Sequence, residues 1–134
     1  MNTTAAPKMI WPCLNYRDAH AAIAFLTDAF GFVKTLVVDG GAERAVAHAE
    51  LRFPEGGGVM LGSASGGGNE FERLPTGSCS VYVATDEPDA LFERATRAGA
   101  TVVRGLEDTD YGSRGFTVRD LEGNLWSFGT YRGE

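Results

Sequence analysis

Long apolar runs, basic residues and cysteines are all scarce in this chain of 134 residues. No apolar run approaches the roughly 20 residues that a membrane-spanning helix needs, so we expect no contact with a membrane. Lysine and arginine number 12 against 18 acidic residues, for a net charge of −6. Nucleic-acid binding requires a clustered basic face, and this balance argues against it. An acidic balance is compatible with a cationic ligand, although mild acidity also serves solubility alone.

The chain has two cysteines, Cys13 and Cys79, and neither stands in a Cys-x-x-Cys pair or near a candidate catalytic base. Two alternatives stay open for them. One is a single disulfide. The other, which we favour for a reducing compartment, is a pair of buried thiols that act as small apolar residues. The segment 1–8 lacks the apolar stretch of a secretory signal, so the expected location is the cytoplasm.

An internal repeat indicates the architecture. The sequence DAHAAI at 18–23 recurs in looser form as DEPDAL at 86–91, and each copy runs one helix length to a glycine, Gly31 or Gly99. The offset is 68 positions both between the two copies and between the two glycines. A repeat of about half the chain indicates two similar modules that face each other across a cleft.

Each module is expected to fold as a strand, a helix and three further strands. Apolar residues at helical or alternating spacing predict these elements, and glycine-containing turns end them. In the first module we expect strands at 9–14, 32–38, 44–53 and 59–62 and a helix at 17–30, with Asn15 or Asp18 as its N-cap. In the second module we expect strands at 78–84, 101–104, 112–119 and 124–130 and a helix at 86–98, with Asp86 as its N-cap.

The fold class predicted from this order is α+β, a single domain over 1–134. Two βαβββ modules, at about 9–63 and 77–131, form a curved, cup-like sheet. The glycine- and serine-rich stretch between them, 64–76, is interpreted as a flexible connection. A mobile lid over a pocket is the alternative for this stretch.

Two parts of the sequence resemble a known family. Tyr16-Arg17-Asp18 opens the first helix, and the chain closes with the stretch YGSRGFTVRDLEGNLWSFGTY at 111–131. With the duplicated βαβββ order, they resemble the vicinal oxygen chelate superfamily, and most of all its glyoxalase/bleomycin-resistance branch. The resemblance covers Ile10 to Tyr131. It departs from the family at Leu121, where the family's turn often carries proline.

The resemblance implies a divalent metal at the centre of the cup, held by His or Glu from four strands. Carried onto this sequence, the four ligand positions fall on Trp11, on Leu61 or its neighbours Met60 and Gly62, on Ser80 and on Ser127. None of these residues is His, Asp, Glu or Cys, so we expect no metal and no cofactor there. His48 and Glu50 share a strand face and are a weak alternative metal site. We favour their being polar residues on a half-exposed strand.

Successive strand residues point to opposite faces of a sheet, so the side chains on the same face as the four family ligand positions are expected to point into the cleft. They are Trp11, Cys13, Leu61, Ser80, Tyr82, Leu125 and Ser127. Tyr111 and Arg114 are expected to gate the mouth or to pair with an anion. Aromatic walls with a few hydroxyls suit an organic ligand. The alternative is that Trp11 and Tyr82 belong to a core or an interface. Trp126 and Phe128 have the opposite parity and are predicted to pack under a helix.

Three functions follow from this interpretation. The favoured one is a metal-independent binding protein of the bleomycin-resistance type, which sequesters an aromatic or cationic compound. The second is a metal-dependent lyase, isomerase or dioxygenase of the same superfamily with an atypical site. The third is a dimeric interaction protein with a filled cleft. A homodimer is expected, because the family usually pairs two chains and open sheets leave strand edges to cover.

Overall fold

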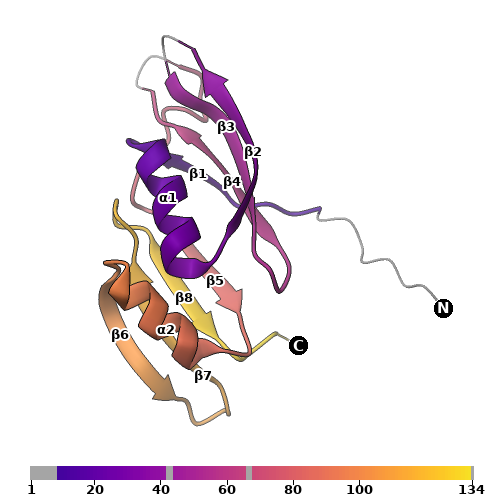
Figure 1. Ribbon diagram of the computed structural model, residues 1–134, viewed down its shortest axis with the longest axis vertical. Helices are drawn as coiled ribbons and strands as arrows, with labels where there is room; N and C mark the ends of the chain where they lie inside the picture. Colours follow the sequence, from indigo (N-terminus) through magenta and orange to yellow (C-terminus); the bar gives the residue numbers. More distant parts are fainter. Residues whose placement is uncertain (1–8, 42–43, 66–67, 134) are drawn as a thin grey trace, which may run out of the picture.

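The computed structural model describes residues 9–41, 44–65 and 68–133, and it has the expected α+β fold of two βαβββ modules (Figure 1). The first module consists of β1 (Cys13–Tyr16), α1 (Ala19–Phe30), β2 (Val33–Gly40), β3 (Arg44–Arg52) and β4 (Gly58–Ser63). The second consists of β5 (Ser80–Ala84), α2 (Pro88–Arg97), β6 (Thr101–Asp108), β7 (Arg114–Arg119) and β8 (Leu125–Gly129). The strand orders are β1-β4-β3-β2 and β5-β8-β7-β6, and in each sheet the first strand pairs in parallel with the last.

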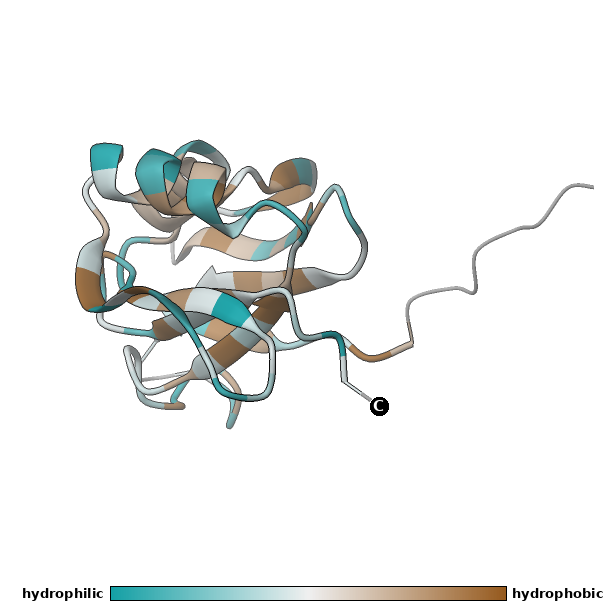
Figure 2. Ribbon diagram, turned by 90° about the horizontal axis from the view of Figure 1, so that it is seen from below, coloured by the Kyte–Doolittle hydropathy of each residue, from teal (hydrophilic) through white to brown (hydrophobic). Residues whose placement is uncertain are grey.

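Helix α1 has the limits that its end signals indicate. The Asp18 side chain accepts a hydrogen bond of 3.1 Å from the Ala21 N–H and so satisfies one donor of the first turn. Gly31 ends the helix in the left-handed conformation, with φ of 81°. Asn15 is not a cap, because its side chain donates instead to the carbonyls of Phe71 and Leu74. Figure 2 shows both helices along one side of the molecule, with the strands on the other.

The N-cap residue of α2 is Glu87. The prediction that Asp86 is the N-cap is therefore wrong. The Asp86 N–H is satisfied from the other module, because it donates to Oε2 of Glu55 at 3.1 Å. Thr85 contributes twice here. Its hydroxyl donates to Oε1 of Glu55 at 2.7 Å and accepts from the Glu87 N–H at 3.1 Å. Pro88 occupies the first turn, where a missing N–H costs nothing.

Two strands differ from their predicted limits. β1 begins at Cys13 and not at Met9, because Pro12 has no N–H with which to join a sheet. β6 continues past Gly105 to Asp108, well beyond the predicted end at 104. Pairing with β7 carries the strand past that glycine, and the register with β7 shifts between Arg104 and Glu107.

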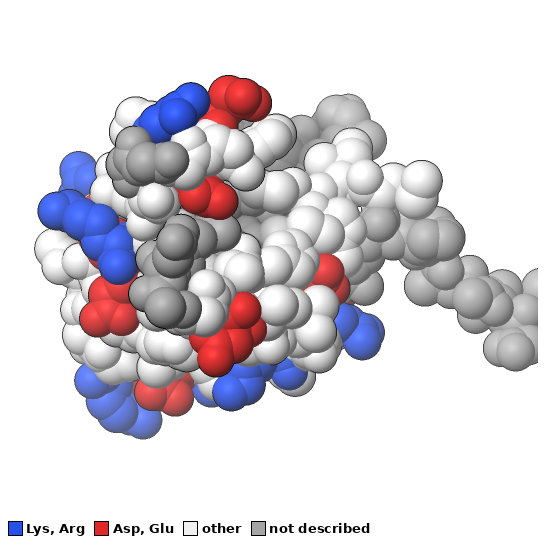
Figure 3. All heavy atoms as spheres, turned by 90° about the horizontal axis from the view of Figure 1, so that it is seen from above, with Lys and Arg blue, Asp and Glu red and all other residues white. Residues whose placement is uncertain are grey.

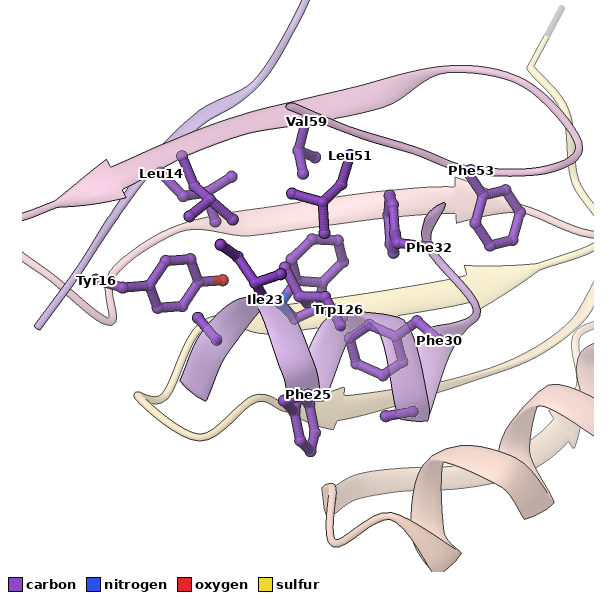
Figure 4. Packing of buried hydrophobic residues seen from close by; sticks show 14 of the residues in the cluster. Leu14, Tyr16, Ile23, Phe25, Phe30, Phe32, Leu51, Phe53, Val59 and Trp126 are labelled. Atoms are coloured by element: carbon purple, nitrogen blue, oxygen red, sulfur yellow. The ribbon is translucent and has the colours of Figure 1, made fainter. Parts of the chain in front are cut away.

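One hydrophobic core joins the two modules. Phe30 is the last residue of α1 and Phe32 follows the helix, and their rings lie 5.2 and 5.7 Å from the ring of Trp126 on β8 (Figure 4). The Phe30 ring also lies 4.8 Å from that of Phe128. Trp126 is fully buried, and Phe128 nearly so. Both were predicted to pack under a helix, and this prediction is confirmed.

The connection between the modules is folded where it is described. The Ser65 N–H donates to the Glu72 carbonyl at 2.8 Å, and the Arg73 N–H donates to the Asn69 carbonyl at 3.2 Å. Asn15 of β1 binds the same segment through its amide group. Residues 69–74 therefore form turns held against β1, which differs from the flexible connection that composition suggested. Residues 66 and 67 lie outside the described part.

Within the described ranges, no helix is both long and apolar enough to cross a membrane.

Candidate functional site

The first sheet has one face against α1 and one face away from it, which we call its open face. Cys13 of β1 stands beside Met60 of β4, and Met60 stands beside Glu50 of β3. The neighbouring residues on each strand point to the core, so these three side chains share the open face. Trp11 extends this face beyond the start of β1. A Cβ at Gly58 would lie 2.8 Å from Cζ3 of Trp11, so the indole lies directly against that glycine.

The side chain of Leu61 points to the core and not into the cleft, which corrects our prediction. Its side chain is 3% exposed and belongs to the hydrophobic core, and its partner on β1 is the equally buried Leu14. The parallel pairing of β1 with β4 places Met60, and not Leu61, on the face of Cys13. Met60 is therefore a residue of the open face that we did not predict to point into the cleft. The sequence indicated it only as an alternative to Leu61 for the fourth-strand ligand position.

His48 and Glu50 lie side by side on the first sheet, as their spacing predicts. Nε2 of His48 and Oε2 of Glu50 are 2.8 Å apart. Their side chains are 40% and 29% exposed, so both are half-open to solvent. The imidazole and the carboxylate form a hydrogen bond with each other, and an incoming ligand can still reach both.

The second sheet has an equivalent open face. Tyr82 of β5 is 50% exposed, and its hydroxyl donates to the Tyr131 carbonyl at 2.5 Å. Burial of this hydroxyl is the largest cause that raises the pKa of Tyr82. Ser127 of β8 shares a hydrogen bond of 2.9 Å with Thr117 of β7. Exposed Ser80 and half-buried Leu125 lie on the same face, as predicted.

Tyr111 and Arg114 have different surroundings. The ring of exposed Tyr111 meets that of Tyr131 edge-on at 6.0 Å, close to the Tyr82 hydroxyl. The guanidinium of Arg114 reaches α2 and makes two hydrogen bonds to Asp89, of 2.8 and 3.0 Å. A third, of 3.2 Å, goes to Asp108. The bonds to Asp89 are the largest cause that raises the pKa of Arg114 and lowers that of Asp89. Arg114 is thus paired with carboxylates of its own chain.

Two cavities adjoin the open faces. One has a volume of about 330 Å³ and lies between the modules, with Tyr82 in one wall and Ile10 and Pro12, the neighbours of Trp11, in another. The other has a volume of about 220 Å³ and lies on the first sheet under the segment 69–72. Its lining includes Cys13, Asn15, His48, Met60, Phe71 and Glu72. Of the nine predicted cleft residues, Tyr82 lines the first cavity, and Cys13 and Leu61 line the second. The other six line neither cavity.

Charge is mixed on the end of the molecule that the first module forms. Figure 3 shows basic and acidic side chains interspersed over this face, and neither sign makes a continuous patch. A ligand that binds here meets individual charged groups and not a broad field of one sign.

The model of the glyoxalase/bleomycin resistance protein/dioxygenase superfamily matches residues 8–128. The chain belongs to this superfamily. It is 37% identical over 123 residues to an uncharacterized protein of Mycobacterium bovis, Mb0911c, which covers 88% of this chain and 80% of that protein. The fold and the family that the sequence resembled are thus both confirmed.

Solved structures of superfamily members share this fold. TioX from Micromonospora sp. ML1 is 33% identical, with a TM-score of 0.77 over 95% of this chain and 100% of that chain. A superfamily member from Sphaerobacter thermophilus is 19% identical, with a TM-score of 0.64 over 90% and 95% of the two chains. The second likeness shows the fold alone.

The metal site that the superfamily implies does not fit the residues present. Trp11, Ser80 and Ser127 occupy three of the four expected ligand positions, and the fourth falls at Leu61, which is buried in the core. An indole, two hydroxyls and an alkyl group are not the imidazole and carboxylate donors that a hard or borderline divalent metal needs. Within the described parts of the chain, no three His, Cys, Asp or Glu side chains gather around a common point.

The two cysteines are free thiols. Cys79 is half-buried and packs against the core, which agrees with the expected role of a small apolar residue. Cys13 is exposed, because it lies on the open face, and the expectation that it is buried is wrong.

Proposed function

We propose that this protein is a cytoplasmic homodimer that binds a small aromatic or cationic organic compound between its modules, without a metal ion. One observation carries this proposal. An accessible aromatic side chain lies on each open face, Trp11 against Gly58 and Tyr82 against Gly129, and each is near a cavity between the modules. Apolar walls give affinity and a few polar groups give orientation, which is how small-molecule sites are built.

The surroundings of the two aromatic side chains support a binding role over a purely structural one. Ser127 and Thr117 supply hydroxyls beside Tyr82, and Glu55 and Arg132 border the cavity of about 330 Å³. A core aromatic residue of this chain looks different, since Trp126 is fully enclosed by the rings of its neighbours.

Tryptophan fluorescence tests the proposal, because Trp11 and Trp126 are the only tryptophans. Flat aromatic compounds with naphthalene, quinoline and acridine rings are titrated into wild-type protein and into Trp11→Phe. We expect saturable quenching in the wild type that is lost in Trp11→Phe, and the same quenching with EDTA present. Trp126 serves as the internal control, because it is out of reach of a ligand.

Two outcomes contradict the proposal. If no compound quenches fluorescence or raises the melting temperature, the binding function loses its support. If EDTA abolishes binding and elemental analysis finds about one metal ion per chain, the metal-dependent enzyme is the better interpretation.

The dimer is proposed from exposed apolar residues on the outer strands. β2 exposes Val33, Leu36, Val37 and Val38, and β6 exposes Val102 and Val103. Outer strands with exposed apolar side chains tend to pair with another chain unless something covers them. We propose that a second copy of the same chain covers them. Light scattering coupled to gel filtration tests this, and a monomer at micromolar concentration contradicts it.

A further inference from the structure

The open face of the first sheet carries an aromatic platform and a carboxylate at a fixed separation. Trp11 lies against Gly58, and Glu50 stands two residue pairs further along the same two strands, opposite Met60. Two residues along a strand span roughly 6.7 Å and neighbouring strands lie about 4.8 Å apart, so positions 58 and 50 are roughly 8 Å apart.

The charges on this face change from one residue pair to the next. Arg52 stands opposite Gly58, in the same pair that supports Trp11, and it brings positive charge there. Glu50 brings negative charge to the next pair on the same face, where Met60 and Cys13 are otherwise uncharged. A ligand that lies along the strands is therefore favoured if its positive group is at Glu50 and its uncharged ring is at Trp11.

The carboxylate of Glu50 is held in place and only partly hydrated. His48 fixes one of its oxygens through the contact of 2.8 Å, and the side chain is 29% exposed. Beside it, the cavity of about 220 Å³ has room for a small substituent, between His48 and Met60 on its floor and Phe71 in its wall. A charge-assisted hydrogen bond in such a place is stronger than one in open water.

We propose that this face selects compounds in which a flat aromatic ring and a protonated amine are joined by a short arm, with the ring on Trp11 and the amine beside Glu50. This inference rests on the proposed function and narrows its ligand class to arylalkylamines. Glu50 determines the specificity, and His48 is a positioning residue that acts through Glu50.

The test uses 1-naphthylalkylamines with arms of two to six carbons and the naphthylalkyl carboxylates of the same lengths. Affinities are measured by calorimetry on the full chain. We expect amines with arms of about three to five carbons to bind about tenfold more tightly than the matching carboxylates. Glu50→Gln is expected to reduce this preference to less than about threefold, with binding of the carboxylates unchanged or improved.

Two further variants separate charge selection from a structural effect. Glu93→Gln removes an exposed carboxylate of α2 that pairs with Arg97, and it is expected to keep the tenfold preference. His48→Gln retains a hydrogen-bond donor, and it is expected to keep more of the preference than His48→Ala does.

The outcomes distinguish this inference from the function on which it rests. If amines and carboxylates bind equally well to the wild type, the selection by Glu50 is wrong, while the aromatic binding function stands. If the preference survives Glu50→Gln, another group selects the amine and the inference is also wrong. If neither series binds and no other aromatic compound does, the proposed function itself fails.

Discussion

The carboxylates of Glu55 and Glu122 make the same contact in opposite directions. Each lies in the turn of a hairpin, and each accepts hydrogen bonds from the chain just before the helix of the other module. Glu122 binds the N–H groups of Arg17 and Asp18 at 2.7 and 2.8 Å, and Glu55 binds the Thr85 hydroxyl and the Asp86 N–H at 2.7 and 3.1 Å. The two modules are thus held together by a pair of reciprocal helix caps.

Removing these caps is expected to loosen the contact between the modules. Glu122→Ala leaves two N–H groups without their acceptor, and we expect the free energy of unfolding to fall by about 1–3 kcal/mol. Glu55→Ala is expected to act in the same direction and less strongly, because its side chain is more exposed. Urea denaturation measures both. The control is Glu93→Ala on the surface of α2, and an equal loss in that variant would contradict a specific role for the caps.

Tyr16 is expected to make stability depend on pH above 10. Burial, and then the neighbouring Asp120 carboxylate, raise the pKa of Tyr16 well above its ordinary value of 10.0. The folded protein therefore keeps the phenol proton that the unfolded chain loses. The contribution is fully present below pH 10 and declines as the pH rises beyond it, by up to about 1.4 kcal/mol per pH unit. Denaturation series from pH 8 to 11 should show a shallower decline for Tyr16→Phe, and equal slopes would falsify this account.

Gly58 is expected to control the placement of Trp11. A Cβ at this position would lie 2.6 Å from the Leu51 carbonyl oxygen and 2.8 Å from the indole, so Gly58→Ala must displace one of them. We expect a loss of about 1–3 kcal/mol in stability and a changed emission maximum for Trp11. Gly105→Ala is the matched control, because a Cβ there meets nothing within 4 Å. If both variants keep the wild-type emission, Gly58 has no such role.

Leu61 and Met60 are expected to respond in opposite ways to substitution. Leu61→Ala opens a cavity in the core, and the expected cost is about 2–4 kcal/mol in the free energy of unfolding, with the affinity for aromatic compounds largely kept. Met60→Ala lies on the open face, and it should cost less than about 1 kcal/mol but weaken the binding of a ligand. Chemical denaturation and titration of the same two proteins check both statements. The reverse pattern would place Leu61, and not Met60, on the open face, and would contradict both statements.

The sequence predicted those features whose signals are local. Asp18 and Gly31 mark the limits of α1 within a few residues, and the repeat revealed the second module because each copy ends at a glycine. His48 and Glu50 were expected to share a face, because strand side chains alternate, and they do so.

The features that depend on distant partners were not predicted. The parallel register with β1 sets the face of the sheet on which the side chain of Leu61 lies, and no local sequence pattern encodes that register. Asp86 has the residue type of an N-cap, but its carboxylate accepts a hydrogen bond of 2.7 Å from Arg132, near the end of the chain. The composition of 64–76 suggested a flexible connection, yet residues 69–74 are held by the amide group of Asn15. In each case the deciding group is far away in the sequence.

The reciprocal caps have a further consequence for assembly. Contacts in which the same turn meets the same helix start in both directions are what two identical chains make about a twofold axis. The protein therefore carries, within a single polypeptide, the geometry of a dimer of half-length chains. Covalent linkage through the segment 64–76 keeps each half at an effective concentration of about millimolar relative to the other. Dilution cannot separate the two halves, so a site between them exists at any protein concentration in the cell.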